Sequence, residues 1–363
     1  MMPNLSDDEN WEVLIGNSNK RFSGVTSTML QTLKHQKHLV KLRVLGPHHL
    51  DDSKLNITFL RAAKACRQTL ANGKWRVFHA RRNDEMIQAL LLKYLFRAKI
   101  KICFTSTAQR RHTWLTRWLM RRMDGIITTS ERANCYLARK ADVIIPHGID
   151  HNTYSPSSDR QASWRALGLP GRYGIGVFGR VRQQKGIDIF VDACIEQLAK
   201  HEDVCAIIVG AIKEEDRSFV AQMKARITEA KLGHRIVFLG EQKFSELPEL
   251  FRSLHLVCAL SRNEGFGLTV LEAMSSGVAV LASDAGAWRE IIRENLDGRV
   301  VGTGDVAATS QALDEMLSKP DRLVEMGNCG RQRILQHYTI EMEAERLVRF
   351  YKTLQDNSPR RIK

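Results

Sequence analysis

The chain has 363 residues, enough for two domains of ordinary size, and 43% of them are apolar, so it can bury a sizeable core. No run of about eighteen uncharged apolar residues occurs, which argues against a membrane-spanning helix, and the net charge of +15 favours an anionic partner. The first residues, MMPNLSDDEN, lack the basic start and apolar run of a signal peptide, so we expect a cytoplasmic protein.

The seven cysteines are scattered along the chain without any CxxC spacing. We interpret them as reduced core residues and predict no disulfide framework. His48 and His49 are adjacent, but no nearby acid or cysteine completes a set of metal ligands. We therefore predict no metal site and no cofactor.

The first half of the chain alternates short Val-, Ile- and Phe-rich runs with helical patterns, which is typical of parallel βαβ units. Helical patterns cover 84–97 and 110–123. After the strand-like WEVLIG, further strands are predicted at 41–46, 75–80, 99–106, 125–130 and 142–148. Positive charge is concentrated here, since eleven Lys or Arg residues lie between Arg97 and Lys140 against only Asp124 and Glu131.

The alternation stops at 150–171, which is rich in Ser, Pro and Gly and is interpreted as a linker. A second series of strands is predicted at 173–180, 204–210, 235–240, 256–261, 278–283 and 298–301, and a helix closes the chain. We predict an α/β protein with two doubly wound Rossmann-like domains facing a cleft. Its parts are a first domain (1–155), a linker (156–171), a second domain (172–338) and a C-terminal helix that packs back on the first domain (339–363).

Two cations follow the first strand of the second half, in GVFGRVRQQKG. Arg180 lies at the carboxyl end of that strand, and Lys185 precedes a helix. Cations at such a position can clamp a diphosphate. The alternative is that both are solvated loop residues.

Two carboxylates flank a glycine-rich bend in SRNEGFGLTVLEAMSSG. A helix is predicted from Leu268, with Glu264 just before it and Glu272 inside it, about 12 Å apart at helical rise. That span fits a nucleotide sugar, with each carboxylate accepting from a pair of hydroxyls and the helix N–H groups facing the diphosphate. The alternative is a capped helix with two surface acids.

The segments FGR…QQKG and SRNEGFGLTVLEAMSSGVAVLAS resemble family 4 retaining glycosyltransferases of the GT-B fold. The resemblance implies that Glu264 contacts the donor sugar, Glu272 holds the ribose, and Arg180 and Lys185 bind the diphosphate without a metal. It assigns Arg180, Lys185 and Glu264 to catalysis, with Arg180 stabilising the leaving group. The remaining donor-binding positions that it implies are Gly24, Gly179, Gly210, Gly265, Phe266, Gly267 and Leu268.

The acceptor side of the prediction rests on the ends of two strands in the first half. FHARRNDEM places His79, Arg81 and Arg82 at a strand end, where the histidine would touch a substrate and the arginines an anionic acceptor. The alternative is a half-buried histidine with surface arginines. Many relatives carry a histidine just after the strand at 99–106, where this chain has Ser106 and Thr107, so His79 and His112 are both candidates for that role.

The segment from Arg110 to Arg122 is amphipathic and basic. Trp114, Leu115, Trp118 and Leu119 share one face, and Arg110 and Arg111 begin the basic rim. Such a helix suits an anionic membrane surface, and Arg110 and Arg111 are predicted to bind an anionic acceptor. A core-facing apolar stripe with a solvated basic face is the alternative.

The segments HARRNDEM, TSTAQRRHT and RRMDGIITTS resemble bacterial lipopolysaccharide core mannosyltransferases. That resemblance implies GDP-mannose as donor, a Kdo-bearing lipid A acceptor, and peripheral association with the inner face of the cytoplasmic membrane. One alternative is a transferase of the same fold that uses a UDP- or ADP-sugar on another envelope or soluble acceptor. Another is a nucleic-acid-binding protein, although no helix-turn-helix, zinc spacing or RNP-type strand is present, so we expect no nucleic-acid partner.

Overall fold

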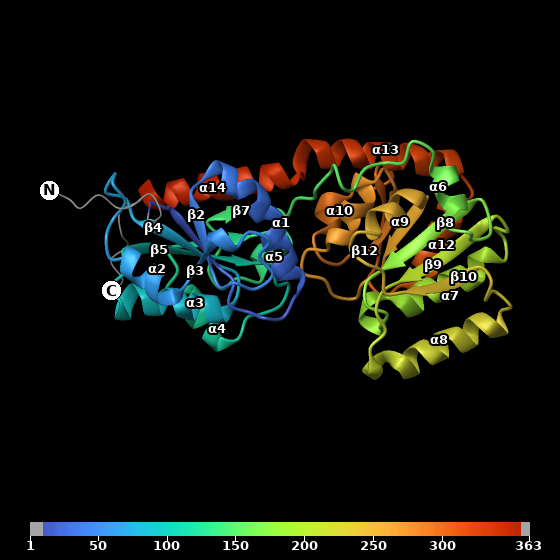
Figure 1. Ribbon diagram of the computed structural model, residues 1–363. Coiled ribbons are helices and arrows are strands. Elements are labelled where there is room, and N and C mark those ends of the chain that lie inside the picture. The colour runs from blue at the N-terminus through green and yellow to red at the C-terminus, as the bar shows by residue number, and fades with distance from the viewer. Residues whose placement is uncertain (1–9, 357–363) are drawn as a thin grey trace. The chain divides into compact units, whose positions relative to one another are not determined.

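The structure is a computed structural model that describes residues 10–356, and the chain forms two compact units. The first unit joins the residues up to Gly148 with those from Ile340 onward, and the second runs from Ile149 to Thr339. Each unit contains one parallel sheet with helices on both faces (Figure 1). Two doubly wound α/β domains, the predicted fold class, are therefore confirmed.

The sheet of the first unit has seven strands in the order β3-β2-β1-β4-β5-β6-β7, all paired in parallel. Its strands are β1 (Val13–Gly16), β2 (Leu42–Leu45), β3 (Asn56–Ile57), β4 (Arg76–Ala80), β5 (Ile100–Ser106), β6 (Gly125–Thr128) and β7 (Val143–Ile144). The two-residue strand β3 escaped the sequence analysis because it is too short to show a pattern.

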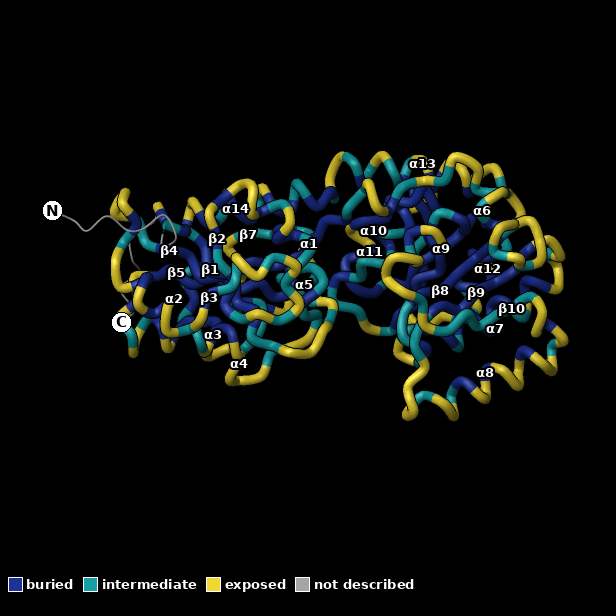
Figure 2. The backbone as a smooth tube through the Cα atoms, in the orientation of Figure 1, coloured by how far each residue is buried: buried dark blue, intermediate teal, exposed yellow. Residues whose placement is uncertain are grey.

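Two groups of helices cover this sheet. Helices α1 (Gly24–Leu39) and α14 (Ile340–Asp356) bury their apolar residues against one face. Helices α2 (Phe59–Ala65), α3 (Asn83–Leu90) and α4 (Trp114–Met120) cover the other. The shorter elements are η2 (Ser53–Leu55), the π-helical turn η3 (Leu91–Leu95) and α5 (Glu131–Cys135). Strands and helix faces are buried together, as the dark blue strands in Figure 2 illustrate.

The sheet of the second unit has six parallel strands in the order β10-β9-β8-β11-β12-β13. They are β8 (Tyr173–Phe178), β9 (Val204–Val209), β10 (Ile236–Gly240), β11 (Leu256–Ala259), β12 (Ala279–Ser283) and β13 (Gly298–Val301). Strands β8, β9, β11 and β12 are rich in Val, Ile, Ala and Leu and are almost wholly buried, as expected for parallel strands covered on both faces.

The helices of the second unit also form two layers. Helices α7 (Ile187–Leu198), α8 (Arg217–Glu229) and α12 (Val306–Leu317) pack on one face. Helices α6 (Arg160–Ala166), α9 (Leu247–Ser253), α10 (Leu268–Ser275) and α11 (Trp288–Ile291) pack on the other. Helix α13 (Pro320–His337) contributes residues to both cores, and η4 (Gln183–Lys185) and η5 (Glu214–Asp216) are single turns.

The segment interpreted as a linker, 156–171, differs from that interpretation because it contains helix α6. The side chain of Asp159 caps the helix by accepting from the N–H of Ala162 at 2.9 Å. Trp164 is fully buried, and its Nε1 donates to the carbonyl of Gly171 at 3.1 Å. One buried tryptophan, Trp164, packs this otherwise polar segment against the second unit. The amino-acid composition of the segment does not indicate that contact.

The strand orders locate one crevice in each unit. In open parallel sheets, ligands bind outside the carboxyl ends of the strands where the order reverses direction. The order reverses between β1 and β4 in the first sheet, and between β8 and β11 in the second. The loops that follow these four strands are therefore the places to examine.

Candidate functional site

Lys185 is held at the reversal point of the second sheet, where the loops after β8 and β11 meet. Its Nζ lies 2.5 Å from Oε2 of Glu264, and both side chains are about one-fifth exposed. The two loops are fastened together because Arg262 makes two 2.8 Å bonds to the carboxylate of Asp188 at the start of α7. The structure thus brings together two residues that are 79 positions apart in sequence.

Glu272 faces the same lysine from the second turn of α10. Burial raises the pKa of the Glu272 carboxyl to about 7, while a hydrogen bond from Tyr154 and the positive charge of Lys185 act in the opposite direction. Lys185 therefore contacts Glu264, and its charge also acts on Glu272. Tyr154 was missed because it lies at the edge of the presumed linker.

The start of helix α10 is shaped to receive a ligand. Gly267 adopts φ +90°, and a Cβ there would meet Nε1 of Trp288 at 2.2 Å, so only glycine fits. The indole Nε1 of Trp288 donates to the carbonyl of Gly267 at 2.9 Å and fixes this bend. No side chain caps the helix, so the N–H groups at Leu268 and beyond face outward without a side-chain acceptor.

The remaining predicted donor positions lie along this edge. Gly265 and Phe266 form the bend before α10, with the Phe266 ring buried. Gly179 and Gly210 end neighbouring strands and are packed so closely that a Cβ on Gly210 would meet the Gly179 carbonyl oxygen at 1.9 Å. Arg180 is turned toward η5, where its Nη1 lies 3.7 Å from Glu215.

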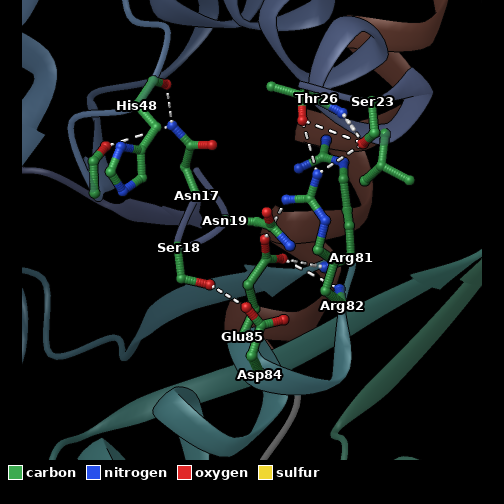
Figure 3. Close-up of polar contacts among 12 residues, drawn as sticks. Asn17, Ser18, Asn19, Ser23, Thr26, His48, Arg81, Arg82, Asp84 and Glu85 are labelled. Carbon is green, nitrogen blue, oxygen red and sulfur yellow. Dashed lines mark hydrogen bonds and ion pairs between the residues drawn. The ribbon is translucent and has the colours of Figure 1, made fainter. Parts of the chain in front are cut away.

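The reversal point of the first sheet carries a second polar cluster, shown in Figure 3. Ser23 caps helix α1 by accepting from the N–H of Thr26, and Gly24, the predicted donor contact, is the first helical residue. Gly16 ends β1 and leaves room for Glu85, because a Cβ at Gly16 would lie within 3.0 Å of that side chain. Glycine at this position thus allows a carboxylate from α3 to lie beneath the loop after β1.

The Arg82 guanidinium uses its hydrogen bonds within this cluster. Its Nη1 donates to Glu85 at 3.1 Å, and its Nη2 donates to Ser23 at 3.0 Å and Thr26 at 2.8 Å. The other carboxylate oxygen of Glu85 accepts from the backbone N–H groups of Arg81 and Arg82. Arg82 therefore joins the starts of α1 and α3, and the predicted role in direct acceptor binding does not match these contacts.

His79 is a core histidine, which corrects the prediction that it touches a substrate. It is fully buried, with Nδ1 2.6 Å from the Tyr351 hydroxyl of α14 and Nε2 2.7 Å from Thr105. Burial, aided by the charge of Arg81, holds the pKa of His79 well below its usual range, so the ring is neutral. The alternative weighed from sequence, a half-buried histidine with surface arginines, differs from the structure as well, because the ring is fully buried and Arg81 and Arg82 are partly buried.

His112 returns to the end of β5 although it follows that strand by six residues. Its Nε2 lies 3.0 Å from the Ser106 hydroxyl, and the ring is half-buried. Burial and the charge of Arg110 lower the pKa of His112. Arg110 and Arg111 are exposed beside it. Of the two candidate histidines, only His112 is open to a ligand.

Only part of the apolar side of helix α4 faces the core. Leu119 and Met120 are buried, whereas Trp114 is 70% exposed and Trp118 42% exposed. Among the residues described, no helix has the length and apolar character to span a bilayer, and no group of three potential metal-ligating side chains comes together.

Comparison with known proteins gives three findings. Residues 161–333 match the family model described as glycosyl transferases group 1. The chain is 40% identical over 97% of its length to the lipopolysaccharide core biosynthesis mannosyltransferase LpcC of Rhizobium leguminosarum bv. viciae, and covers 98% of it. It is 39% identical over 96% of its length to the lipopolysaccharide core biosynthesis mannosyltransferase LpsB of Rhizobium meliloti, and covers 99% of that protein.

One solved structure extends these comparisons, and another shows the fold. The C-terminal domain of a group 1 glycosyl transferase (LpcC) from Francisella tularensis is 34% identical, with a TM-score of 0.52 over 53% of this chain and all of that domain. Anabaena HepE in complex with UDP has a TM-score of 0.76 over 94% of this chain and all of its own, at 18% identity.

Proposed function

Because the chain belongs to the group 1 glycosyl transferases and is a glycosyltransferase, we propose that it moves mannose from GDP-mannose to the inner core of lipopolysaccharide. The observation that carries the proposal is the contact of Lys185 with Glu264 beside the uncapped start of α10, where the charge of Lys185 also acts on Glu272. The choice of mannose and of a lipopolysaccharide acceptor is supported by the names of two nearly full-length relatives.

The donor is proposed to lie along the carboxyl edge of the second sheet. Glu264 accepts from hydroxyls of the sugar, Glu272 from the ribose, and the diphosphate meets Lys185 and the N–H groups that begin α10. Arg180 joins the clamp by leaving Glu215, a surface partner that it contacts at only 3.7 Å. The backbones of Gly179, Gly210, Gly265, Phe266, Gly267 and Leu268 are proposed to line this site.

The reaction is proposed to be metal-independent and to retain the anomeric configuration. Charge grows on the leaving diphosphate as the glycosidic bond breaks, and Lys185, Arg180 and the α10 N–H groups stabilise it. The departing phosphate accepts the proton of the attacking hydroxyl on the same face of the sugar, and Glu264 holds the sugar's own hydroxyls.

The acceptor is proposed to be an anionic, lipid-linked saccharide that binds the first unit. Arg110, Arg111 and His112 follow β5 and are open to solvent or half-buried, and Arg81 follows β4. A neutral His112, fixed through Ser106, suits contact with sugar hydroxyls.

Peripheral membrane association is proposed through an apolar surface on α3, η3 and α4, which we call the α3–α4 surface. Asn83 at the start of α3 donates to Thr116 of α4 at 2.9 Å, so these helices are fastened side by side. The surface consists of the exposed residues Ile87, Leu91, Tyr94, Leu95, Trp114, Leu115 and Trp118. Exposed arginines at 110, 111, 117 and 121 surround its α4 side, so charge complementarity favours an anionic lipid bilayer as the occupant.

Thermal stabilisation of the purified chain by GDP, UDP and ADP, without added metal, tests the donor site. We expect a rise in melting temperature with GDP that exceeds the rises with UDP and ADP. A selective response to UDP or ADP would keep the glycosyltransferase and replace its proposed donor. If no nucleotide stabilises the chain, the proposed donor site is wrong.

A further inference from the structure

We propose that the reversal point of the first sheet contains a subsite for one anionic group of the acceptor, with Arg81 as its ligand and Arg82 as a positioning residue. The inference rests on the proposed function and names the chemistry that its acceptor side recognises. Arg81 follows β4, and the loop beginning at Asn17 follows β1, so both lie where the strand order reverses.

The first step is the charge balance of the cluster. Glu85 is buried, and its two oxygens accept from the Arg82 guanidinium and from two backbone N–H groups. Asp84, the next carboxylate in the cluster, accepts from the Ser18 hydroxyl at 2.6 Å and is exposed. The charges of Arg81 and Arg82 both act on the buried carboxylate of Glu85, so the two guanidinium groups together carry one positive charge more than it can balance.

The second step is the position of Arg81 itself. Its Nη1 is buried and has no hydrogen-bond partner in the described part of the chain, although the residue as a whole keeps some exposure. Its charge acts on the buried groups of His79, Tyr351 and Glu85. A buried guanidinium nitrogen without an acceptor is unfavourable, and because Glu85 is shared by two arginines, an incoming anion would remove that cost.

The third step is the polar wall opposite Arg81. Asn17 is fully buried, its Nδ2 donates to the carbonyl of His48 at 2.6 Å, and its Oδ1 has no partner among the residues described. In Figure 3 this oxygen points toward the side of the cluster where Thr26 and the two arginines lie. The first turn of the sixteen-residue helix α1 adds its partial positive charge.

These groups describe one kind of ligand. A guanidinium and a helix start select an oxyanion, and an amide oxygen beside them accepts from a hydroxyl. A sugar that carries both a carboxylate or phosphate and a neighbouring hydroxyl satisfies the set. The subsite would therefore take an acidic saccharide and discriminate against the same saccharide with its charge removed.

The experiment compares wild type with Arg81→Gln, Arg82→Gln and, as control, Arg67→Gln, which alters an exposed arginine bonded to the Phe96 carbonyl. The kinetic arm measures transfer from GDP-mannose to Kdo-lipid A and to its carboxyl methyl ester. We expect wild type and the control to favour the acid by about 10- to 100-fold in kcat/KM, as for a hydrogen bond to a charged group. Arg81→Gln should reduce this preference to within about threefold with an unchanged KM for GDP-mannose.

The second arm measures melting temperature in a low-salt buffer, with and without inorganic phosphate as the probe. Arg82→Gln should melt several degrees lower than wild type because Oε1 of the buried Glu85 loses its donor, whereas Arg81→Gln should melt no lower than wild type. Phosphate should stabilise wild type more than Arg81→Gln.

Three outcomes overturn the inference. They are a stability loss in Arg81→Gln equal to that of Arg82→Gln, an unchanged preference for the acid, and a raised KM for GDP-mannose in place of the acceptor effect. If wild type transfers mannose to neither acceptor, the proposed function fails. The phosphate arm then decides the subsite, which falls if wild type gains no more stability than Arg81→Gln.

Discussion

The charge of Lys185 acts on both Glu264 and Glu272, yet the proposed roles predict different effects when each is substituted. Glu264→Gln should lower kcat for mannose transfer by about 100-fold or more while changing nucleotide affinity by less than about threefold, because the sugar and not the nucleotide loses its acceptor. Initial rates and calorimetric titration with GDP measure the two effects. Glu325→Gln, which alters an exposed partner of Arg322, is the control. A large loss of GDP affinity in Glu264→Gln would contradict the assignment.

The raised pKa of Glu272 predicts that GDP affinity and the stability of the ligand-free protein depend on pH in opposite directions. The carboxylate must be ionised to accept from ribose, so GDP affinity should fall as the pH drops through about 7. In the ligand-free protein the folded pKa is above the unfolded value, so its contribution to stability is present below about 4.5 and is lost as the pH rises through about 7. Titrations of GDP at several pH values test this, and Glu272→Gln should flatten the profile.

His79 serves as a link between β4 and the C-terminal helix. Tyr351→Phe removes the hydroxyl that bonds both His79 and Gln36, leaving two buried groups without their partner. The free energy of unfolding should fall by about 1–3 kcal/mol, which lowers the melting temperature by about 2–4 °C for each kcal/mol. Acceptor KM should stay unchanged, and a selective rise in that KM would restore His79 to the acceptor site.

At the residue scale, sequence reasoning succeeded where the partners share a short motif. Glu264, Gly267 and Glu272 lie within one strand–helix unit, so their spacing alone indicated a ligand site. It failed for His79 because the decisive partner, Tyr351, is 272 residues away. Arg82 was misjudged for the same reason, since Ser23 and Thr26 belong to another element.

At the element scale, α4 and its neighbours predict a measurable affinity for anionic membranes. Trp114→Ala should weaken binding to phosphatidylglycerol vesicles by about 10-fold, because it removes a large exposed aromatic group from the α3–α4 surface. Phe244→Ala is the matched control, since Phe244 is 71% exposed in the second unit against 70% for Trp114. Equal effects of the two changes in vesicle sedimentation, or equal binding to neutral phosphatidylcholine vesicles, would contradict this role.

Elements with a strong local pattern were predictable, and those stabilised by a single contact were not. Strands such as β5 and β12 are continuous apolar runs, and α14 has a clear amphipathic repeat. Helix α6 depends on one buried residue, Trp164, within a polar segment, and β3 is only two residues long. In α4 the sequence identified the apolar face but could not tell that Trp114 and Trp118 remain outside the core.

At the scale of the whole molecule, each unit repeats one architecture and carries a different chemistry at its reversal point. The second unit offers a lysine bonded to Glu264 and a helix start without a side-chain cap. The first offers Arg81 and Arg82 at its reversal point, and a half-buried histidine, His112, after the neighbouring strand β5. The order of the strands in each sheet could not be predicted from the sequence, because it depends on which strands pair. That order locates the reversal point of each sheet.

The most direct test of the central claim is transfer of radiolabelled mannose from GDP-mannose to Kdo-lipid A by the purified chain in the presence of EDTA. We predict labelled lipid product, with α-linkage retained from the donor, and at most about 1% of that rate in Glu264→Gln. Product with UDP- or ADP-sugars alone would contradict the proposed donor. The absence of any labelled lipid from a chain that binds GDP would contradict the proposed acceptor.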